Sequence, residues 1–320
     1  MGINLDSLLR SRSIQDTGFD NSTGNSSGRI LEKDGQSNVR RRGLPWSERV
    51  SFFLSLINMR SSHFIFLVGT FLLVVNLFFA SLYYIIGTEQ IGVDSQWNEL
   101  RKFYEAFFFS AQTLTTVGYG KLHPDTLLSN SVATFEAVFG WMSFAVLTGL
   151  VYGRFSKPKA YLKFSANALI SPYKEGKALM FRMAPYKNNN LTEAEVLVNV
   201  SLRIPEHGKM VNKFLSLPVE VPRIAFLALN WTVVHAINEE SPFYGMLESE
   251  FEEREVEILI FVKAFDEHFA NTVKHRTSYV AGEIIHGAKF KQMFRQSDDG
   301  QSTLLELDKL SDYDRVSLPS

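Results

Sequence analysis

The chain has 320 residues, 45% of them hydrophobic and 13% aromatic, so it is too apolar to be disordered throughout and long enough for two structural units. Its 33 Lys and Arg balance 34 Asp and Glu, which gives no indication of a nucleic-acid partner. The absence of cysteine excludes disulfides, thiolate catalysis and cysteine-ligated metal sites. Of the 27 phenylalanines, 15 cluster between Phe52 and Phe155, which indicates contact with lipid.

The first 60 residues divide into two parts. Residues 1–43 are rich in Ser, Asn, Gly and charge and have no sustained apolar period, so we expect a disordered tail that lacks the apolar core of a signal peptide. Residues 44–60 place apolar and polar side chains on opposite sides at helical spacing, which predicts a helix lying in the membrane interface. An N-terminal extension of the next helix is the alternative.

The segment from Phe64 to Ile86 is almost entirely apolar. At ~1.5 Å per residue it is long enough to cross ~30 Å of hydrocarbon, so we predict a membrane-spanning outer helix over residues 63–87. A buried helix of a large soluble protein is the alternative. Arginines that precede the segment place the N-terminus in the cytoplasm by the positive-inside rule. They are Arg40, Arg41, Arg42, Arg49 and Arg60.

A second apolar segment predicts an inner helix over residues 130–154. Its hydropathy is weakened by polar residues, among them Thr148 and Glu136, which a pore-lining helix tolerates. A carboxylate inside the membrane is costly unless it faces protein or water, so we expect Glu136 to lie in the shell that supports a pore. Cations follow at Arg154, Lys157 and Lys159, which places this end in the cytoplasm too and makes the two spans a hairpin.

Between the spans, residues 99–115 predict a Phe-rich amphipathic helix too short to cross the membrane. It leads into residues 116–120, a motif whose carbonyls, if repeated around a fourfold axis, are expected to replace the hydration shell of K+. The members of this filter are Thr116, Val117, Gly118, Tyr119 and Gly120. The two glycines supply backbone freedom, the Thr hydroxyl adds an oxygen, and the Tyr ring braces the loop. A turn in an ordinary protein is the alternative. Because a filter ring needs four such segments and the chain carries one, the motif implies a homotetramer.

After Pro158 the sequence changes to short β-type runs broken by Pro, Gly and Asn. This pattern predicts an antiparallel β-sandwich over residues 159–296, and residues 297–320 return to Ser, Asp and Gly and predict a tail.

From about Trp46 to about Phe294 the chain resembles the inward-rectifier potassium channels, and specifically their prokaryotic KirBac branch. Besides the filter, the resemblance is carried by Gly149–Pro158, Phe164–Ala168, Trp231–His235, Glu240–Gly245 and Ser278–Tyr279 with Glu283–Ile284. It implies a membrane α-helical two-transmembrane potassium-channel pore over residues 61–158, a slide helix over residues 44–60, and an all-β immunoglobulin-like cytoplasmic domain that extends the conduction path.

The resemblance also implies roles for inner-helix residues. Phe144 occupies the cavity position where strongly rectifying relatives carry an acid, which implies weak rectification. Thr148 and Tyr152 follow at i+4 and i+8 on the same face, so the three are expected to line the conduit with Tyr152 as the gate. Packing of this face on a neighbouring helix is the alternative. Gly149 matches a glycine regarded as a hinge, although it also permits close helix packing.

Two departures from the family lie beside the filter. Relatives usually have Glu at the position of Gln112, which with Thr115 is expected to support the filter, and Asp at the position of Lys121. Four cations match positions that sense anionic lipid, and phosphatidylinositol bisphosphate typically inhibits prokaryotic members. They are Arg60, Arg154, Lys157 and Lys159. Ordinary positive-inside flanking charge is the alternative.

Other chemistry has little support in the sequence. The seven His form no pair at i, i+4, which makes a metal site or a catalytic site unexpected. No Arg-rich helix suggests voltage gating. A two-span pore with a nucleotide-binding domain would need a glycine-rich signature after Lys159, which is missing. We expect a voltage-independent, homotetrameric potassium channel in a bacterial inner membrane that is not an enzyme, uses no cofactor and binds no nucleic acid. A membrane-tethered ligand-binding module is the rival.

Overall fold

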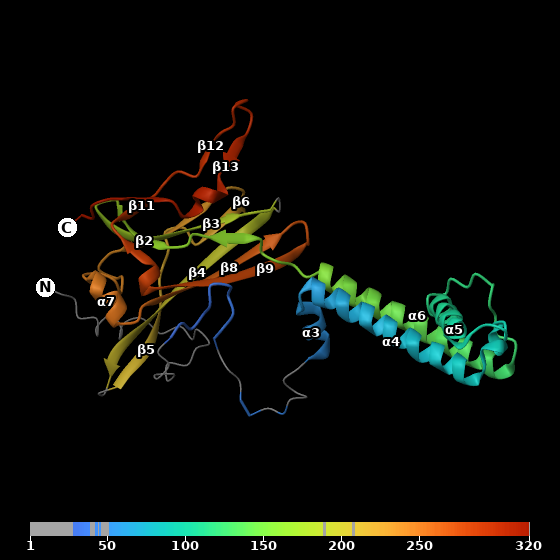
Figure 1. Ribbon diagram of the computed structural model, residues 1–320. Coiled ribbons are helices and arrows are strands. Elements are labelled where there is room, and N and C mark those ends of the chain that lie inside the picture. Colours follow the sequence, from blue (N-terminus) through green and yellow to red (C-terminus); the bar gives the residue numbers. More distant parts are fainter. Residues whose placement is uncertain are drawn as a thin grey trace. The chain divides into compact units, whose positions relative to one another are not determined.

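The computed structural model describes residues 28–38, 42–43, 45, 51–187, 190–206 and 209–319 (Figure 1). These residues form two compact units. The helical unit lies within residues 42–157, and the β unit combines residues 28–38 with the chain from Pro158 onward. Residues 1–27 and 39–41 of the predicted tail (residues 1–43) lie outside the described residues, as do residues 44 and 46–50 of the predicted interfacial helix (residues 44–60). Arg40, Arg41 and Arg49 are among them.

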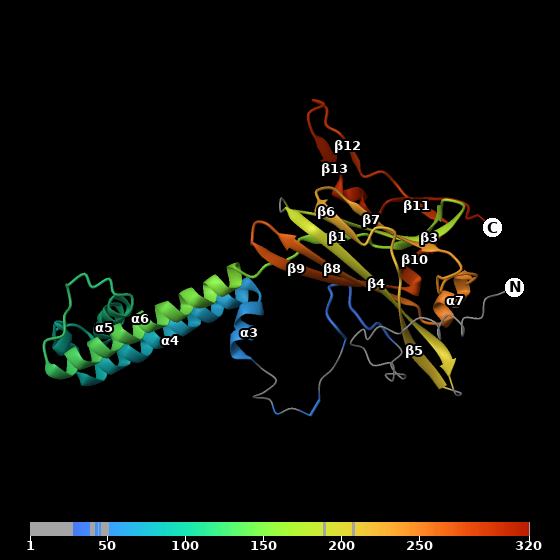
Figure 2. The same cartoon turned by 180° about the vertical axis from the view of Figure 1, so that it is seen from behind.

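The helical unit contains two helices long and apolar enough to cross a membrane, and they lie side by side in both views (Figures 1 and 2). Its elements are α3 (Phe52–Asn58), α4 (Ser61–Ile86), η1 (Thr88–Ile91), α5 (Glu99–Leu114) and α6 (Leu127–Phe155). The two long helices are α4 and α6. Polar side chains fix the starts of two helices: Asn98 accepts from the Arg101 N–H at α5, and Thr126 and Ser129 form a capping box at α6.

The break between α3 and α4 answers one question that the sequence left open. Met59 and Arg60 have extended backbone between the two helices, so α3 is a separate helix and not an extension of α4. Its N-cap is Ser51, whose hydroxyl accepts from the Leu54 N–H at 3.4 Å.

The core of the helical unit lies where the short α5 packs against both long helices. Tyr83 of α4 meets Phe109 of α5 edge to face, with ring centroids 5.0 Å apart. Ala106 of α5 and Ala133 of α6 complete the same buried cluster. Large apolar side chains elsewhere on α4 and α6, such as Phe66 and Trp141, are exposed in the single chain. A surface of this kind is stable against lipid or against further protein, as expected of a membrane protein.

The β unit is a sandwich of two five-stranded sheets. The first has the order β1-β3-β2-β10 with β7 paired to β3, and the second has the order β5-β4-β8-β9 with β6 paired to β4. All these pairs are antiparallel except β10 with β2. The strands are β1 (Leu162–Phe164), β2 (Ala168–Tyr173), β3 (Gly176–Pro185), β4 (Leu191–Glu206), β5 (Lys209–Ser216), β6 (Arg223–Leu227), β7 (Trp231–Ile237), β8 (Glu257–Asp266), β9 (Asn271–Val280) and β10 (Ile284–His286).

One hydrophobic core holds the two sheets together. On β4, alternate residues from Val196 to Leu202 point into it, as period-2 burial requires. Phe181 of β3 and Trp231 of β7 enter from the other sheet, and Tyr279 of β9 is fully buried beside Phe181. The all-β class predicted from the short alternating runs is therefore found.

The C-terminal residues differ from the predicted tail. Residues 288–315 contain further short strands, and Leu310 is buried against Met293 and Ala184. The elements are β11 (Ala288–Phe290), β12 (Phe294–Gln296), β13 (Thr303–Leu305), η3 (Leu307–Ser311) and β14 (Tyr313–Arg315). The polar stretch after residue 296 is the turn of the β12–β13 hairpin, in which the Ser297 N–H donates to the Ser302 carbonyl at 2.8 Å. Composition alone does not separate such a turn from a tail.

The end of the predicted N-terminal tail is also ordered. Residues 28–38 lie against the second sheet, where Leu31 is 1% exposed between Phe214 of β5 and Leu259 of β8. The backbone returns on itself, since the Asn38 N–H donates to the Ile30 carbonyl at 3.0 Å. The segment is polar overall, so its composition did not indicate that one apolar side chain, Leu31, is buried against the sheet.

Candidate ion-conduction site

The predicted filter leaves α5 as a loop whose first amides are tied to the helix end. The Val117 and Gly118 N–H groups both point to the Gln112 carbonyl, at 2.9 and 3.4 Å. The Thr115 hydroxyl donates to the Ala111 carbonyl at 2.6 Å. Thr115 and the Gln112 backbone thus hold the start of the loop, whereas no hydrogen bond of the Gln112 amide side chain is found among the described residues.

Backbone conformation alternates along the loop. Thr116, Gly118 and Gly120 have φ of 58°, 52° and 77°, in the left-handed region, and Val117 and Tyr119 between them do not. This alternation turns successive carbonyls toward one side, which an extended strand cannot do. The two glycines adopt it without a Cβ penalty. Left-handed Thr116 costs of order 1–3 kcal/mol, a strain that the glycine pattern did not reveal.

The loop has little support within its own chain. Every residue from 115 to 120 is exposed, and the Tyr119 side chain is 79% exposed. The brace predicted for Tyr119 is therefore not made inside one chain. Next to the loop, the Lys121 ammonium lies 3.3 Å from a Glu105 carboxylate oxygen, so the positive charge that departs from the family pattern is partly offset.

Glu136 joins the three helices of the site. It lies on α6 and is fully buried. One carboxylate oxygen accepts from the Tyr83 hydroxyl of α4 at 2.7 Å, and the other accepts from the Ser110 hydroxyl of α5 at 2.5 Å. Ser110 also lies 3.2 Å from the Asn76 side-chain oxygen. The sequence suggested a supporting role, and the structure places the carboxylate against the helix that carries the filter.

A second contact between α6 and α5 was missed by the sequence analysis. A Cβ placed on Gly140 would lie 2.1 Å from the carbonyl oxygen of Leu114, the last residue of α5. Only glycine allows this approach. The available signal was a glycine in the middle of an apolar helix, which is too common to single out. By contrast, a Cβ on Gly149, the predicted hinge, meets nothing within 4 Å among the described residues.

A recess of about 320 Å³ lies below the start of the loop. The end of α5 and the first filter residues form one wall, and α6 forms the other. Phe144 and Thr148 both line it, and the Thr148 hydroxyl donates to the Phe144 carbonyl at 2.8 Å. Tyr152 lies one turn farther along α6, exposed and outside the recess.

The four predicted lipid-binding cations have unequal surroundings. Arg60 and Lys159 are exposed and form no ion pair or side-chain hydrogen bond with the described part of the chain. Lys157 donates to the Asn58 side-chain oxygen at 2.5 Å. The Arg154 guanidinium is half-buried and bonds to backbone carbonyls at the end of α3.

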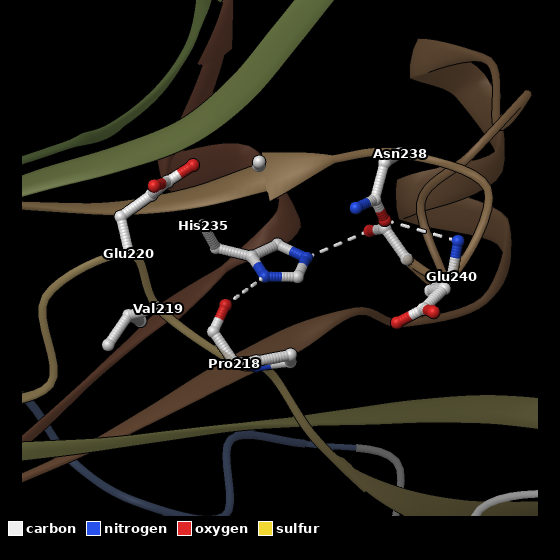
Figure 3. Close-up of a pocket in the computed structure, with 8 residues that line it drawn as sticks. Pro218, Val219, Glu220, His235, Asn238 and Glu240 are labelled. Carbon is white, nitrogen blue, oxygen red and sulfur yellow. Dashed lines mark hydrogen bonds between the residues drawn. The ribbon is translucent and has the colours of Figure 1, made fainter.

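The β unit contains a smaller pocket of about 230 Å³ beside His235 (Figure 3). The ring Nδ1 lies 2.6 Å from the Pro218 carbonyl, and Nε2 lies 2.8 Å from the Ser241 hydroxyl. These bonds tie β7 to the loops on either side, so the Trp231–His235 and Glu240–Gly245 motifs fix loop structure. Within the described residues, no group of His, Asp and Glu could hold a metal ion.

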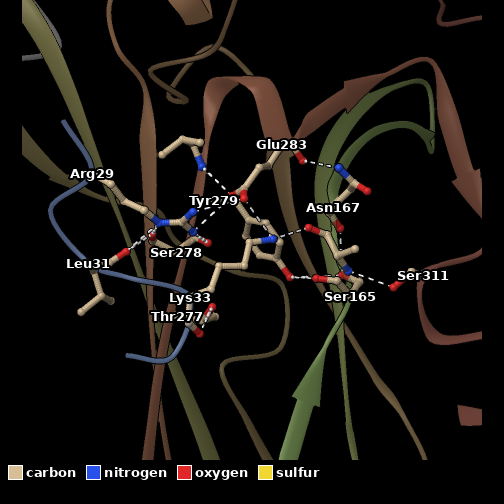
Figure 4. A network of polar contacts seen from close by, with 12 residues as sticks. Arg29, Leu31, Lys33, Ser165, Asn167, Thr277, Ser278, Tyr279, Glu283 and Ser311 are labelled. Atoms are coloured by element: carbon tan, nitrogen blue, oxygen red, sulfur yellow. Dashed lines mark hydrogen bonds and ion pairs between the residues drawn. The ribbon is translucent and has the colours of Figure 1, made fainter. Parts of the chain in front are cut away.

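Ion pairs and hydrogen bonds to carboxylates hold residues 28–38 against the β unit (Figure 4). The Glu257 carboxylate accepts from the Ile30 and Leu31 N–H groups at 2.7 and 3.0 Å, and the Arg29 guanidinium lies 3.1 Å from Glu283. Burial raises the pKa of Glu257, against the opposing effect of these backbone N–H groups. Sequence analysis missed this site, because the paired residues lie more than 200 positions apart.

Comparisons with known proteins agree with this geometry. Residues 162–320 match the family described as inward rectifier potassium channel C-terminal domain, and residues 70–157 match the family described as ion channel. The chain is 35% identical over 282 residues to the inward rectifier potassium channel Kirbac3.1 of Paramagnetospirillum magnetotacticum, covering 86% of this chain and 92% of the relative.

Vertebrate relatives are more distant. The chain is 27% identical to the ATP-sensitive inward rectifier potassium channel 12 of Gallus gallus and to the G protein-activated inward rectifier potassium channel 4 of Mus musculus. Each match covers 82% of this chain but only 66% and 67% of those longer proteins. A solved structure of the sporulation control protein Spo0M from Bacillus subtilis covers 44% of this chain and 61% of its own at a TM-score of 0.23 and 6% identity, too weak a likeness to carry an argument.

The ion channel match covers the part of the chain with the two apolar helices, the inward rectifier C-terminal domain match covers the β-sandwich, and the match to Kirbac3.1 covers 86% of this chain and 92% of the relative. The chain is therefore a KirBac-like member of the inward rectifier potassium channel family.

Proposed function

We propose that four copies of this chain surround one axis and conduct K+ passively and selectively through residues 116–120. The alternating left-handed backbone at Thr116, Gly118 and Gly120 carries this proposal, because it turns a row of carbonyls to one side. The C-terminal end of α5 adds roughly half a negative charge below the row, which favours a cation. The family consists of ion channels, so the protein is not an enzyme, and K+ is its permeant ion and not a cofactor.

What a single chain lacks supports the proposed homotetramer. One chain supplies one filter loop, and a ring of carbonyls around an ion needs four. In the single chain the loop is exposed on every residue, and apolar side chains of α6 such as Trp141 and Val146 are exposed as well. Packing of further copies on these surfaces, with Tyr119 braced across the contact, supplies the missing support.

The gate of this channel is assigned to the exposed face of α6. Phe144 and Thr148 line the recess below the filter, and Tyr152 on the same face forms the narrow apolar ring that closes. Movement of the β unit and of α3 opens this ring, with Gly149 as the bending point. An apolar Phe144 gives polyamines and Mg2+ no carboxylate to bind, so rectification is weak.

Anionic lipid of the phosphoinositide type modulates the gate through exposed cations at the helix ends, chiefly Arg60 and Lys159, with Lys157 beside them. By the positive-inside rule, the same cations support a bacterial inner-membrane location with both termini in the cytoplasm. The bacterial source of Kirbac3.1 supports this location.

Rubidium uptake into liposomes tests the proposal against the rival of a membrane-tethered ligand-binding module. Purified full-length protein in K+-loaded vesicles is diluted into radioactive Rb+ with and without external barium. A channel accumulates Rb+, and barium blocks the uptake; a tether gives uptake equal to that of empty vesicles.

A further inference from the structure

The C-terminal end of α3 is capped by a side chain from another helix. The last carbonyls of a helix have no partner within it. Arg154 of α6 donates through Nη1 to the Leu56 and Ile57 carbonyls at 2.6 and 3.1 Å. Its Nη2 donates to the Met59 carbonyl at 2.7 Å and to the Ser61 hydroxyl at 3.4 Å. One planar fork therefore satisfies the Leu56 and Ile57 carbonyls in the last turn of α3 and the carbonyl of its C-cap Met59, and its charge lies at the negative end of the helix dipole.

Packing around the guanidinium makes this junction tight. The Arg154 guanidinium carbon lies 4.5 Å from the centroid of the Phe64 ring, which covers one face of the fork. Next to it, a Cβ on Gly153 would lie 3.2 Å from the Ile57 side chain, so α3 packs directly on the backbone of α6. Lys157 reaches the Asn58 side chain one turn later. Apart from the Phe64 ring, which belongs to α4, these contacts join α3 to the last turn of α6 and to Lys157 just beyond it.

Arg154 therefore differs in kind from the other cations near the membrane surface. A site for a phosphate headgroup needs donors that are free to bind it. Both terminal nitrogens of Arg154 already have acceptors, Nη1 at the end of α3 and Nη2 at Met59 just after it. Lys159, by contrast, is exposed and has no side-chain partner in the part of the chain that the structure describes. In the sequence, Arg154 and Lys159 are both cations and cannot be told apart by charge. In the structure, their hydrogen-bond partners and exposure distinguish them.

We propose that Arg154 is a positioning residue that fixes α3 to the end of α6, so that any displacement of α3 is passed to the turn that carries Tyr152. Lipid recognition belongs to exposed cations such as Lys159. The junction itself is independent of conduction, whereas its effect on the gate rests on the function proposed above.

Hydrogen exchange of the full-length protein in lipid nanodiscs tests the junction directly. Arg154→Gln removes the cap, so we expect α3 amides within residues 52–59 to exchange at least ~10-fold faster, equivalent to ~1.4 kcal/mol of lost local stability. Lys159→Gln removes the same charge and should leave this exchange unchanged. Unaltered exchange in Arg154→Gln, or equal acceleration in both variants, overturns the proposal. Exchange over α5 and β4 checks that each variant is folded.

Rubidium uptake titrated with phosphatidylinositol bisphosphate separates positioning from lipid binding. Arg154→Lys keeps the charge but has one terminal nitrogen where the guanidinium has two, so it should behave like Arg154→Gln. In both variants we expect the Rb+ flux at saturating lipid to change. The lipid content that gives half of the maximal effect should stay within ~2-fold of the wild-type value. Lys159→Gln should shift the half-effect content. Wild-type behaviour of Arg154→Lys, with only the half-effect content shifted in Arg154→Gln, assigns Arg154 to the lipid site and overturns the proposal. Absence of uptake in the wild type contradicts the proposed function but leaves the exchange result decisive for the junction.

Discussion

At Gly118 the backbone has φ of 52°, which an L-residue with a Cβ adopts at a cost of roughly 1–2 kcal/mol. Four subunits incur this cost together, and the loop can relieve it only by turning a carbonyl away from the ion. We expect Gly118→Ala to lose the preference for Rb+ over Na+, measured as the ratio of the two uptake rates in liposomes. Retained preference would contradict the role given to this carbonyl.

Gly92 offers a matched control for this variant. It has φ of 80° at the end of η1, and an added Cβ meets nothing within 4 Å among the described residues. Gly92→Ala therefore imposes similar backbone strain outside the filter. We expect its selectivity to be unchanged, so that loss of preference in Gly118→Ala reports on the filter and not on strain in general.

The buried Glu136 carboxylate is expected to stabilise the contact of α5 with the long helices. Glu136→Ala leaves the Tyr83 hydroxyl without its acceptor, which costs of order 1–3 kcal/mol, and leaves the Ser110 hydroxyl only its longer contact with Asn76. Glu136→Gln keeps one carbonyl acceptor and should lose less. Thermal unfolding in detergent measures both, with the exposed Glu89→Gln as control. Equal midpoints for all three variants would show that the network contributes nothing.

At the scale of helices, the approach of α6 to α5 depends on Gly140. Its ideal Cβ lies 2.1 Å from the Leu114 carbonyl oxygen, closer than real Cβ contacts, so Gly140→Ala must displace the end of α5. Overpacking of this kind costs ~1–3 kcal/mol and moves the first residues of the filter. We expect Rb+ uptake to fall roughly tenfold or more.

Gly149→Ala on the same helix is the comparison for this prediction. Its Cβ meets open space within the described chain, so folding and filter geometry should be unaffected. If Gly149→Ala changes only how often the channel opens, and not its selectivity or stability, the result would fit the hinge role of Gly149. If Gly140→Ala conducts like the wild type, the close contact does not hold the filter in place.

The elements that the sequence predicted are those with local signals. A short stretch of sequence is enough to recognise the apolar runs that form α4 and α6, and the same holds for the pentapeptide Thr116–Gly120. The ordered segment around Leu31 could not be predicted, because its partners Phe214 and Glu257 are brought near only by the fold. The same is true of Arg154, whose carbonyl partners are about 95 residues away and whose charge resembles any flanking cation.

For the whole molecule, acid is expected to weaken the β unit through two histidines. Burial lowers the pKa of His275, which packs on Phe164, and of His286, which packs on Phe251. The unfolded chain takes up these protons at higher pH, so stability falls as pH drops through about 6.5. Glu257 acts in the opposite sense, because its raised pKa lets the folded state bind a proton more readily as pH falls.

Thermal unfolding between about pH 8 and about pH 6 measures this effect. The double variant His275→Phe with His286→Phe cannot take up the two protons and should show a flatter dependence of midpoint on pH than the wild type. An unchanged slope would mean that neither ring contributes to the acid response.

The claim on which the account depends is that the carbonyl row of residues 116–120, repeated in four chains, selects K+. Current through the wild-type protein in a planar bilayer, with K+ on one side and a mixture of Na+ and less K+ on the other, tests it most directly. The account predicts reversal at the equilibrium potential of K+. Reversal near zero, with Na+ carrying as much current as K+, would contradict it.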